Sequence, residues 1–375
     1  MIGLPPFLSF SENERILQLK ILMIILRTVK NISSLNIAAS VLLFLAAILA
    51  AVVANSSLSP VYQDFLLQEL HLRIGNFNLF SHGGHPLKMI EFINDCLMTV
   101  FFLAVGLEIK RELLVGELSS VRKAALPFIA ACGGMVVPVV IYALSVASGT
   151  PETRGMAIPM ATDIAFSLGV LSLLGKRVPL SLKIFLTAFA VVDDIGGILV
   201  IALFYSADVA YGYLIAAAVL YVFLYYMGKF GVTQKIFFLF FGVIIWYLFL
   251  QSGIHSTISG VILAFVIPAR PRLDAGKYIE RIRDIIGEFP VSKSDNIVLT
   301  NAQIATLKQV ERASDYVISP LQSLEDNLHG AVSFVILPLF AFANAGVVFS
   351  GSGSIVGDVS IAVAAGLLLG KFLGI

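Results

Sequence analysis

The stretch AFAVVDDIGGILVIALF, residues 188–204, places two adjacent carboxylates, Asp193 and Asp194, inside an otherwise apolar run. About 20 such residues are needed to cross the hydrocarbon core of a bilayer. The rest of the chain is equally apolar, since 58% of its 375 residues are hydrophobic, 13% are charged and the mean hydropathy is +0.94. A soluble domain of this length needs more charged surface. The sequence therefore predicts an all-α polytopic membrane protein.

Ten segments are candidates for transmembrane helices. They lie near 35–54, 90–107, 124–148, 156–175, 182–206, 209–227, 235–251, 254–268, 331–349 and 359–375. The eighth is short for a span, and the tenth stops where the chain stops. Residues 1–34 contain the stretch ILQLKILMIILRTVK (16–30), in which Lys20, Arg27 and Lys30 interrupt the apolar residues, a pattern typical of an amphipathic helix at the membrane interface. We expect this segment to precede one transmembrane domain over 35–375.

Two segments between the spans have predicted structure of their own. LHLRIGNFNLF (70–80) alternates apolar and polar residues around Gly75-Asn76, which predicts a small external β-hairpin. The following SHGGHP, with His82 and His85, is expected to be a flexible loop without a metal site. Residues 269–330 form one long polar loop, within which YIERIRDIIGEF predicts an amphipathic helix. Most basic residues fall on the side of the N-terminus, so the positive-inside rule predicts that the N-terminus and this loop are cytoplasmic.

Five ionisable residues lie well inside the predicted spans: Asp95, Asp163, Asp193, Asp194 and Lys371. Each costs roughly 2.5–3.5 kcal/mol on insertion scales, so a membrane protein that keeps such residues usually uses them. The alternatives are a buried structural ion pair or a neutral, hydrogen-bonded carboxyl group.

Asp193 and Asp194 are poorly explained as a structural pair, which would use opposite charges. Adjacent carboxylates repel each other and a low dielectric disfavours both charges, so we expect the pair to hold at least one proton near neutral pH. Carboxylate oxygens suit a small, hard cation, which must displace protons to enter. On a helix the two side chains point about 100° apart. Asp193 shares its face with Gly196 and Gly197, where another backbone can approach.

Asp163 lies in MAIPMATDIAFSLG, where Pro159 removes a backbone hydrogen bond and Thr162 and Asp163 follow within one turn. An interrupted membrane helix offers free carbonyl and N–H groups as ion ligands. A simple proline kink with a capping Thr-Asp pair also explains the pattern, and both interpretations stay open.

Lys371 lies in AAGLLLGKFLGI, where Gly366, Gly370 and Gly374 recur every four residues and predict a flat ridge for close helix packing. The lysine either uses its charge in the site or snorkels to the membrane interface. For Asp95, two interpretations stay open: a local hydrogen bond and a role in transport. His255, in QSGIHSTISG, is either a satisfied histidine at a span junction or a pH sensor, since an unperturbed imidazole titrates at about pH 6.5.

Four stretches carry a resemblance to a known family. They are MATDIAFSLGVLSLLGKRVPLSLKIFLTAFAVVDDIGGILVIALFY (160–205), FINDCLMTVFFLAVGLEIKREL (92–113), SGIHSTISGVILAFVIP (252–268) and ILPLFAFANAGV (336–347). Each closely resembles the NhaA-type sodium/proton antiporters of bacterial inner membranes. The similarity runs from about residue 36 to the end of the chain, apart from a loop near 273–318 that is longer than usual.

The resemblance implies twelve spans arranged as inverted repeats with interrupted helices. It also implies pH-regulated exchange of intracellular Na+ or Li+ for external H+, serving sodium and pH homeostasis, in a multi-pass inner-membrane protein. Because two carboxylates can hold two protons or one monovalent cation, we expect the exchange to be electrogenic. The partners expected are the lipid bilayer, Na+ and H+, and a second copy of the chain through the 70–80 hairpin. Neither a cofactor nor a nucleic acid is expected.

The resemblance assigns the roles of the family's ion site to those residues of this chain that match its motifs. Asp194 becomes the expected Na+ ligand, with Asp193 as its partner and Thr162 and Asp163 at the break of the fourth span. Lys371 matches the lysine of the family's tenth span and becomes the expected counter-ion of Asp193.

Three further residues are candidates for pH sensing by the same resemblance. His255 matches the histidine of the family's pH-sensing region, Glu325 matches an acidic residue near the cytoplasmic funnel, and Glu108 belongs to the same cytoplasmic cluster. The chain departs from the family at its end, because it stops at Ile375 just after the lysine motif. We therefore expect a truncated chain that lacks the last two spans, including the interrupted helix that crosses the fourth.

Two other classes of protein also place ionisable side chains within the membrane. An intramembrane aspartyl protease also needs two carboxyl groups in the bilayer, but they converge from separate helices in GxGD and YD contexts, and neither motif occurs here. An enzyme is therefore not expected. A proton channel or receptor-like protein is the third class, and sodium-dependent proton movement would distinguish the antiporter from both.

Overall fold

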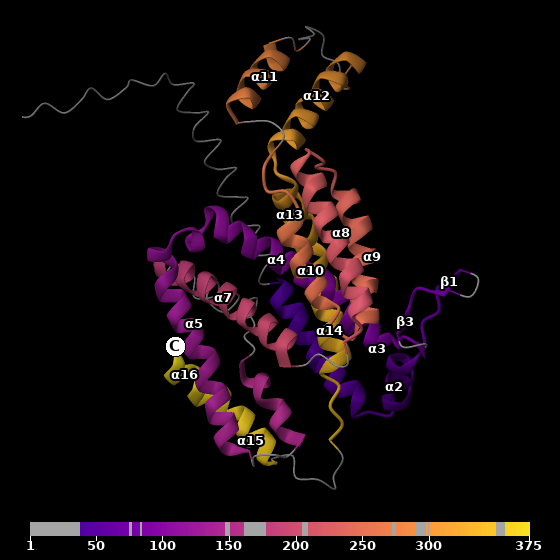
Figure 1. The fold of residues 1–375 in the computed structure, drawn as a ribbon, viewed down its shortest axis with the longest axis vertical. Helices are drawn as coiled ribbons and strands as arrows, with labels where there is room; N and C mark the ends of the chain where they lie inside the picture. The colour runs from indigo at the N-terminus through magenta and orange to yellow at the C-terminus, as the bar shows by residue number, and fades with distance from the viewer. Residues whose placement is uncertain are drawn as a thin grey trace, which may run out of the picture.

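The computed structural model describes residues 38–74, 77–82, 85–146, 151–160, 178–204, 209–271, 275–287, 289, 298, 300–349 and 357–375. Within these ranges the chain folds into long helices with two small β-hairpins at one side (Figure 1). The predicted N-terminal helix over 1–34 lies outside the described residues. So do Thr162 and Asp163, together with most of the fourth predicted span.

Five helices in the described ranges are long and apolar enough to cross a membrane. They are Met89–Val115, Val121–Ser145, Tyr211–Lys229, Lys235–Ser252 and Pro320–Asn344. They lie over the predicted spans near 90–107, 124–148, 209–227, 235–251 and 331–349. The helix Ala38–Ala54 and α2 (Ser59–Leu67) meet at 113° and make a sixth if counted as one broken span. The predicted number of ten spans is not confirmed.

The elements follow the chain in a simple order. The helices are α2, α3 (Met89–Glu91), α4 (Met98–Val115), α5 (Val121–Ser145), α7 (Leu180–Phe204), α8 (Tyr211–Lys229), α9 (Lys235–Ser252), α10 (Thr257–Val266), α11 (Ala275–Gly287), α12 (Asn301–Val317), α13 (Pro320–Ala331), α14 (Leu337–Asn344), α15 (Asp358–Ala365) and α16 (Lys371–Gly374). Three π-helical segments, η1 (Phe92–Leu97), η5 (Val332–Ile336) and η6 (Gly366–Gly370), join α3 to α4, α13 to α14 and α15 to α16. The described ranges also contain two 3₁₀ helices, η2 (Glu117–Ser119) and η3 (Pro151–Met160).

The predicted hairpin is present, but it is smaller than expected and is followed by a second one. Strands β1 (Arg73–Ile74) and β2 (Phe77–Asn78) pair antiparallel, as the 70–80 pattern predicts. Strands β3 (Ser81–His82) and β4 (His85–Pro86) pair next, with His82 opposite His85. The prediction of a flexible loop at SHGGHP was therefore wrong, because backbone pairing across the Gly-Gly dipeptide orders both histidines.

The long polar loop is also shorter than predicted. Its amphipathic helix is confirmed as α11, which packs on α12, and the two helices extend away from the bundle (Figure 1). Residues 320–330, which were assigned to the loop, instead form α13 and continue into the span. Ser319 caps α13 by accepting a hydrogen bond from the Gln322 amide, and Pro320 follows at the first helical position. These two residues fix the helix start although the segment is polar.

The interior near the Asp193-Asp194 pair is formed by α4, α5 and α7. Residues 188–192 of α7 are fully buried and pack with Ala130 and Ala131 of α5 and with Val105 and Ile109 of α4. Helices α15 and α16 pack on α5 (Figure 1). This arrangement brings the C-terminal lysine helix within reach of the aspartates.

Candidate functional site

Asp193 and Asp194 lie in the middle of α7 and differ in burial. The Asp193 side chain is 3% exposed, whereas Asp194 is half-buried. The difference follows from the helical geometry, because consecutive side chains point about 100° apart and cannot share one environment. The structure therefore supports the prediction that the two carboxylates face different neighbours.

Lys371 and Asp193 form a buried ion pair. Nζ of Lys371 donates to Oδ2 of Asp193 at 3.1 Å and to the carbonyl oxygen of Met160 at 2.6 Å. The lysine side chain is 16% exposed, so it turns into the bundle instead of snorkelling to the membrane interface. Met160 is the last residue of η3 and directly follows Pro159, where the predicted break begins. The ammonium thus links the aspartate helix α7 to the end of η3, which Thr162 and Asp163 follow in the sequence.

The glycine ridge explains how Lys371 reaches this position. A Cβ on Gly370 would lie 2.6 Å from Cα of Pro138, and a Cβ on Gly374 would lie 2.3 Å from the carbonyl oxygen of Gly133. Backbone contacts this close are open only to glycine, and they bring η6 and α16 directly against α5. The predicted role of the ridge in helix packing is confirmed.

The two glycines after the aspartates behave differently from each other. A Cβ on Gly196 would collide with Sδ of Met135 on α5, at 2.0 Å, whereas among the described residues nothing lies within 4 Å of a Cβ on Gly197. The expected close approach at this face occurs at Gly196 alone, and a side chain makes it instead of a backbone.

Glu108 and Glu325, two of the three predicted pH-sensing residues, lie in one acidic cluster. Nε of Arg111 donates to Oε1 of Glu325 at 2.9 Å, and Nη2 of Arg111 lies 3.1 Å from Oε1 of Glu112. Glu108 interacts electrostatically with Glu325, Arg111 and Glu112. Glu112 is 8% exposed and accepts a further hydrogen bond from the Glu117 amide. The cluster therefore holds three carboxylates around one guanidinium.

His255, the third predicted pH-sensing residue, does not join this cluster. It is exposed and lies just before α10, at the opposite end of that helix from the last-turn carbonyls that contact Lys110. Its electrostatic partner is Asp95 of η1. Oγ of Ser256 donates to Oδ1 of Asp95 at 3.3 Å, so the Asp95 carboxylate has the hydrogen-bonded local setting that was one of its two interpretations.

Three groups of the ion pair and the acidic cluster were not predicted from the sequence. The Met160 carbonyl could not be found, because a backbone group carries no residue signature. Arg111 and Glu112 stand in EIKREL, three and four residues after Glu108, and this spacing puts them on one helix face. That pattern could have predicted an ion-pair cluster. In the described ranges, no group of three or more His, Cys, Asp or Glu side chains is arranged to hold a metal ion.

Comparison with known proteins identifies the family. A sequence profile described as "Na+/H+ antiporter 1" matches residues 30–375. The chain therefore belongs to the Na+/H+ antiporter 1 family. It is 76% identical over 353 residues to the "Na(+)/H(+) antiporter NhaA" of Bacteroides thetaiotaomicron, covering 94% of this chain and 80% of that protein. The predicted resemblance is confirmed.

Other Na+/H+ antiporter relatives match over a similar region. The protein of the same name from Bacteroides fragilis is 75% identical over 353 residues, covering 94% of this chain and 81% of the relative. That from Porphyromonas gingivalis is 47% identical over 356 residues, covering 93% and 78%. These matches do not support the expectation of a truncated chain.

Proposed function

We propose that this member of the Na+/H+ antiporter 1 family exchanges intracellular Na+ or Li+ for external H+. The observation that carries the proposal is the ion pair between Lys371 and Asp193, which lies next to Asp194 in the α7 helix. Family membership supports the class of transport, and the ion pair supports the assignment of the site to α7.

The chemistry proposed is competition between protons and a cation for carboxylate oxygens. Asp194 acts as the principal oxygen ligand, since it is the less buried of the two, and Asp193 is its partner. When the site is empty, the Lys371 ammonium neutralises Asp193. Thr162 and Asp163 are proposed to contribute ligands at the predicted break of the fourth span. Oxygen ligands suit a small, hard cation, and entry of that cation displaces protons.

The exchange is proposed to be electrogenic. Two carboxylates can hold two protons or one monovalent cation, so each cycle moves net positive charge inward. A membrane potential then drives each net charge by about 2.3 kcal/mol per 100 mV.

Control by pH is assigned to the cluster of Glu108, Arg111, Glu112 and Glu325, with His255 acting separately at the other end of α10. Protonation of a carboxylate in the cluster would remove an attraction to Arg111 and change how α4 and α13 are held together. Loss of these side chains without any change in the pH profile of exchange would contradict this role.

The proposed setting is the bacterial inner membrane, with a cytoplasmic N-terminus as the distribution of basic residues predicts. The hairpin at 70–80 is proposed as a contact between two copies, because its strand edges are otherwise open to pairing. Retention of the dimer after removal of residues 73–78 would contradict this contact.

The test is sodium-induced proton movement in proteoliposomes, with the potential held at zero and at about −100 mV, where the difference is about 2.3 kcal/mol per charge moved. We expect faster exchange at the negative potential. Asp194→Asn should abolish it, because the amide keeps the volume but cannot titrate. Asp64→Asn, which changes an exposed carboxylate of α2, serves as the matched control. Equal rates at both potentials would refute electrogenicity, and normal sodium binding in Asp194→Asn would refute the site.

A further inference from the structure

Lys110 of α4 caps the C-terminal end of the neighbouring helix α10. Its Nζ donates to the carbonyl oxygens of Phe265 at 2.7 Å, Ile267 at 2.5 Å and Ala264 at 3.3 Å. The last carbonyls of a helix have no intrahelical partner and carry the negative end of the helix dipole. A half-buried ammonium from α4 therefore satisfies them and fixes the end of α10 on α4.

This contact is distinct from the acidic cluster beside it. Among the described residues, Lys110 makes no ion pair, whereas Arg111, the next residue, binds two carboxylates. α10 itself carries no titratable side chain between Thr257 and Val266. The titratable and charged groups on the elements that surround Lys110, which are α4, η2 and α13, are Glu108, Arg111, Glu112, Glu117, Glu325, Asp326 and His329.

The two helices that Lys110 connects pack with little space between them. A Cβ on Gly106 would lie 2.8 Å from Cβ of Ala264, and a Cβ on Gly260 would lie 2.4 Å from the carbonyl oxygen of Thr99. At the start of α10, Oγ of Ser256 donates to the Asp95 carboxylate. α10 is therefore attached to the helix Met89–Val115 by polar contacts at both ends and by close packing between them.

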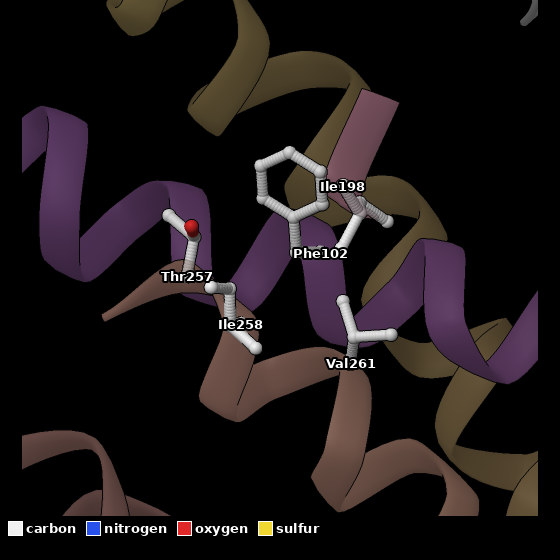
Figure 2. Close-up of a pocket in the computed structure, with 5 residues that line it drawn as sticks. All are labelled: Phe102, Ile198, Thr257, Ile258 and Val261. Atoms are coloured by element: carbon white, nitrogen blue, oxygen red, sulfur yellow. The ribbon is translucent and has the colours of Figure 1, made fainter. Parts of the chain in front are cut away.

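The first turns of α10 lie near the aspartate helix α7. Phe102 of α4, Ile198 of α7, and Thr257, Ile258 and Val261 of α10 line a small pocket between the three helices (Figure 2). Ile198 comes four residues, or one helical turn, after Asp194. A displacement of the start of α10 would therefore change the surroundings of Ile198, one turn from the proposed cation ligand.

We propose that Lys110 is a positioning residue for cation binding: by fixing the end of α10 on α4, it keeps the start of that helix beside Ile198 of α7, one turn from Asp194. The inference rests on the proposed function and adds to it a residue that touches neither aspartate. Lys110 acts through the α10 backbone: its ammonium sets where the helix ends on α4, and the helix sets the packing at Ile198.

The test compares Lys110→Met, which keeps the aliphatic stem and removes the donors, with Lys110→Arg, which keeps donors and charge. Lys123→Met is the matched control, since Lys123 lies 3.7 Å from Glu117 with 57% of its side chain exposed. We expect Lys110→Met to raise the apparent KM for sodium about fivefold, a size typical of a residue that modulates a site without contacting the ligand. The maximal rate should stay within about twofold, and Lys110→Arg and Lys123→Met should resemble the unmodified chain.

A second measurement tests, without relying on transport, whether Lys110 holds the end of α10. Amide hydrogen exchange of the peptide covering 257–271 should be faster in Lys110→Met than in the unmodified chain and Lys123→Met, because the end of α10 frays when its carbonyls lose their donor. If the hydrogen exchange of this peptide is unchanged in Lys110→Met, Lys110 does not hold the end of α10. A lower maximal rate with an unchanged KM would show a structural cap alone and overturn the positioning role. If the unmodified chain neither transports nor binds sodium, the proposed function fails, and the positioning role fails with it.

Discussion

The ion pair between Lys371 and Asp193 allows the sharpest test of the site, by a double-mutant cycle. Removing one member of a buried pair costs about 3–5 kcal/mol, because the other charge is left without compensation. Asp193 is 3% exposed and Lys371 is 16% exposed, so the remaining carboxylate has little access to water. We expect Lys371→Met to lower the free energy of unfolding by about 3 kcal/mol, at the lower end of that range because Lys371 retains some exposure.

Asp193→Asn should cost less, about 1–2 kcal/mol, because an amide oxygen still accepts a hydrogen bond from the ammonium. The Met160 carbonyl also stays available to Lys371, at 2.6 Å. The double variant contains neither charge, so its loss should be smaller than the sum of the single losses. We expect a coupling energy of about 2 kcal/mol, which is within the range for residues in direct contact.

The assay is equilibrium unfolding in detergent micelles, titrated with sodium dodecyl sulfate and followed by far-UV circular dichroism, for the unmodified chain, both single variants and the double variant. The free energies must be measured in the absence of Na+ and Li+, because the pair is proposed to form in the empty site. Additive losses, with a coupling energy below about 0.5 kcal/mol, would refute the pairing, since that is the scatter expected for independent sites.

Two further predictions concern packing and the acidic cluster. Gly370→Ala should lower the melting temperature, with a cost of about 1–3 kcal/mol, because its Cβ would lie 2.6 Å from backbone Cα of Pro138, whereas Gly212→Ala, with nothing within 4 Å among the described residues, should not. An unchanged melting temperature in Gly370→Ala would contradict the close packing of η6 on α5. Arg111→Gln should lose about 1–3 kcal/mol and Arg111→Lys should recover only part of it, because Nε and Nη2 serve two carboxylates at once. Full recovery by Arg111→Lys in the same melting assay would show that charge alone matters there.

The elements that the sequence predicted well are those whose signal is local. Long apolar runs marked the five span helices, and the alternation around Gly75-Asn76 marked β1 and β2. The amphipathic period in YIERIRDIIGEF marked α11. In each case the pattern that stabilises the element lies within the element itself, so no knowledge of its neighbours was needed.

The elements that it missed depend on distant parts of the chain. The bend after Ala54 places Tyr62 on the end of α14, where its hydroxyl donates to the Phe342 carbonyl at 2.6 Å across 280 residues. The sequence could not show this partner. The start of α13 was missed for another reason, since a hydropathy criterion ignores the polar SPLQSLEDNL segment, although Ser319 and Pro320 form a recognisable helix start.

The site was predicted unevenly for the same physical reason. Asp193, Asp194 and Lys371 could be found because a charge in an apolar run is unusual in itself. Whether Lys371 pairs with Asp193 or snorkels depended on helix packing, which the structure gives. The grouping of His255 with Glu108 and Glu325 came from the family resemblance alone, and the structure places His255 at the other end of α10.

The π-helical segments explain how polar contacts form at depth in so apolar a chain. A π turn shifts backbone hydrogen bonding by one residue and is frequently found at functional sites. In η1, the carbonyl of Asp95 accepts from Thr99 Oγ1 at 2.5 Å, from Trp246 Nε1 at 3.2 Å and from Ser256 Oγ at 3.2 Å. One backbone oxygen thus attaches α9 and α10 to this span. η6 ends directly before Lys371, whose ammonium donates to Asp193. η1 and η6 therefore lie beside polar contacts between helices, which in an apolar surrounding have no water to replace them.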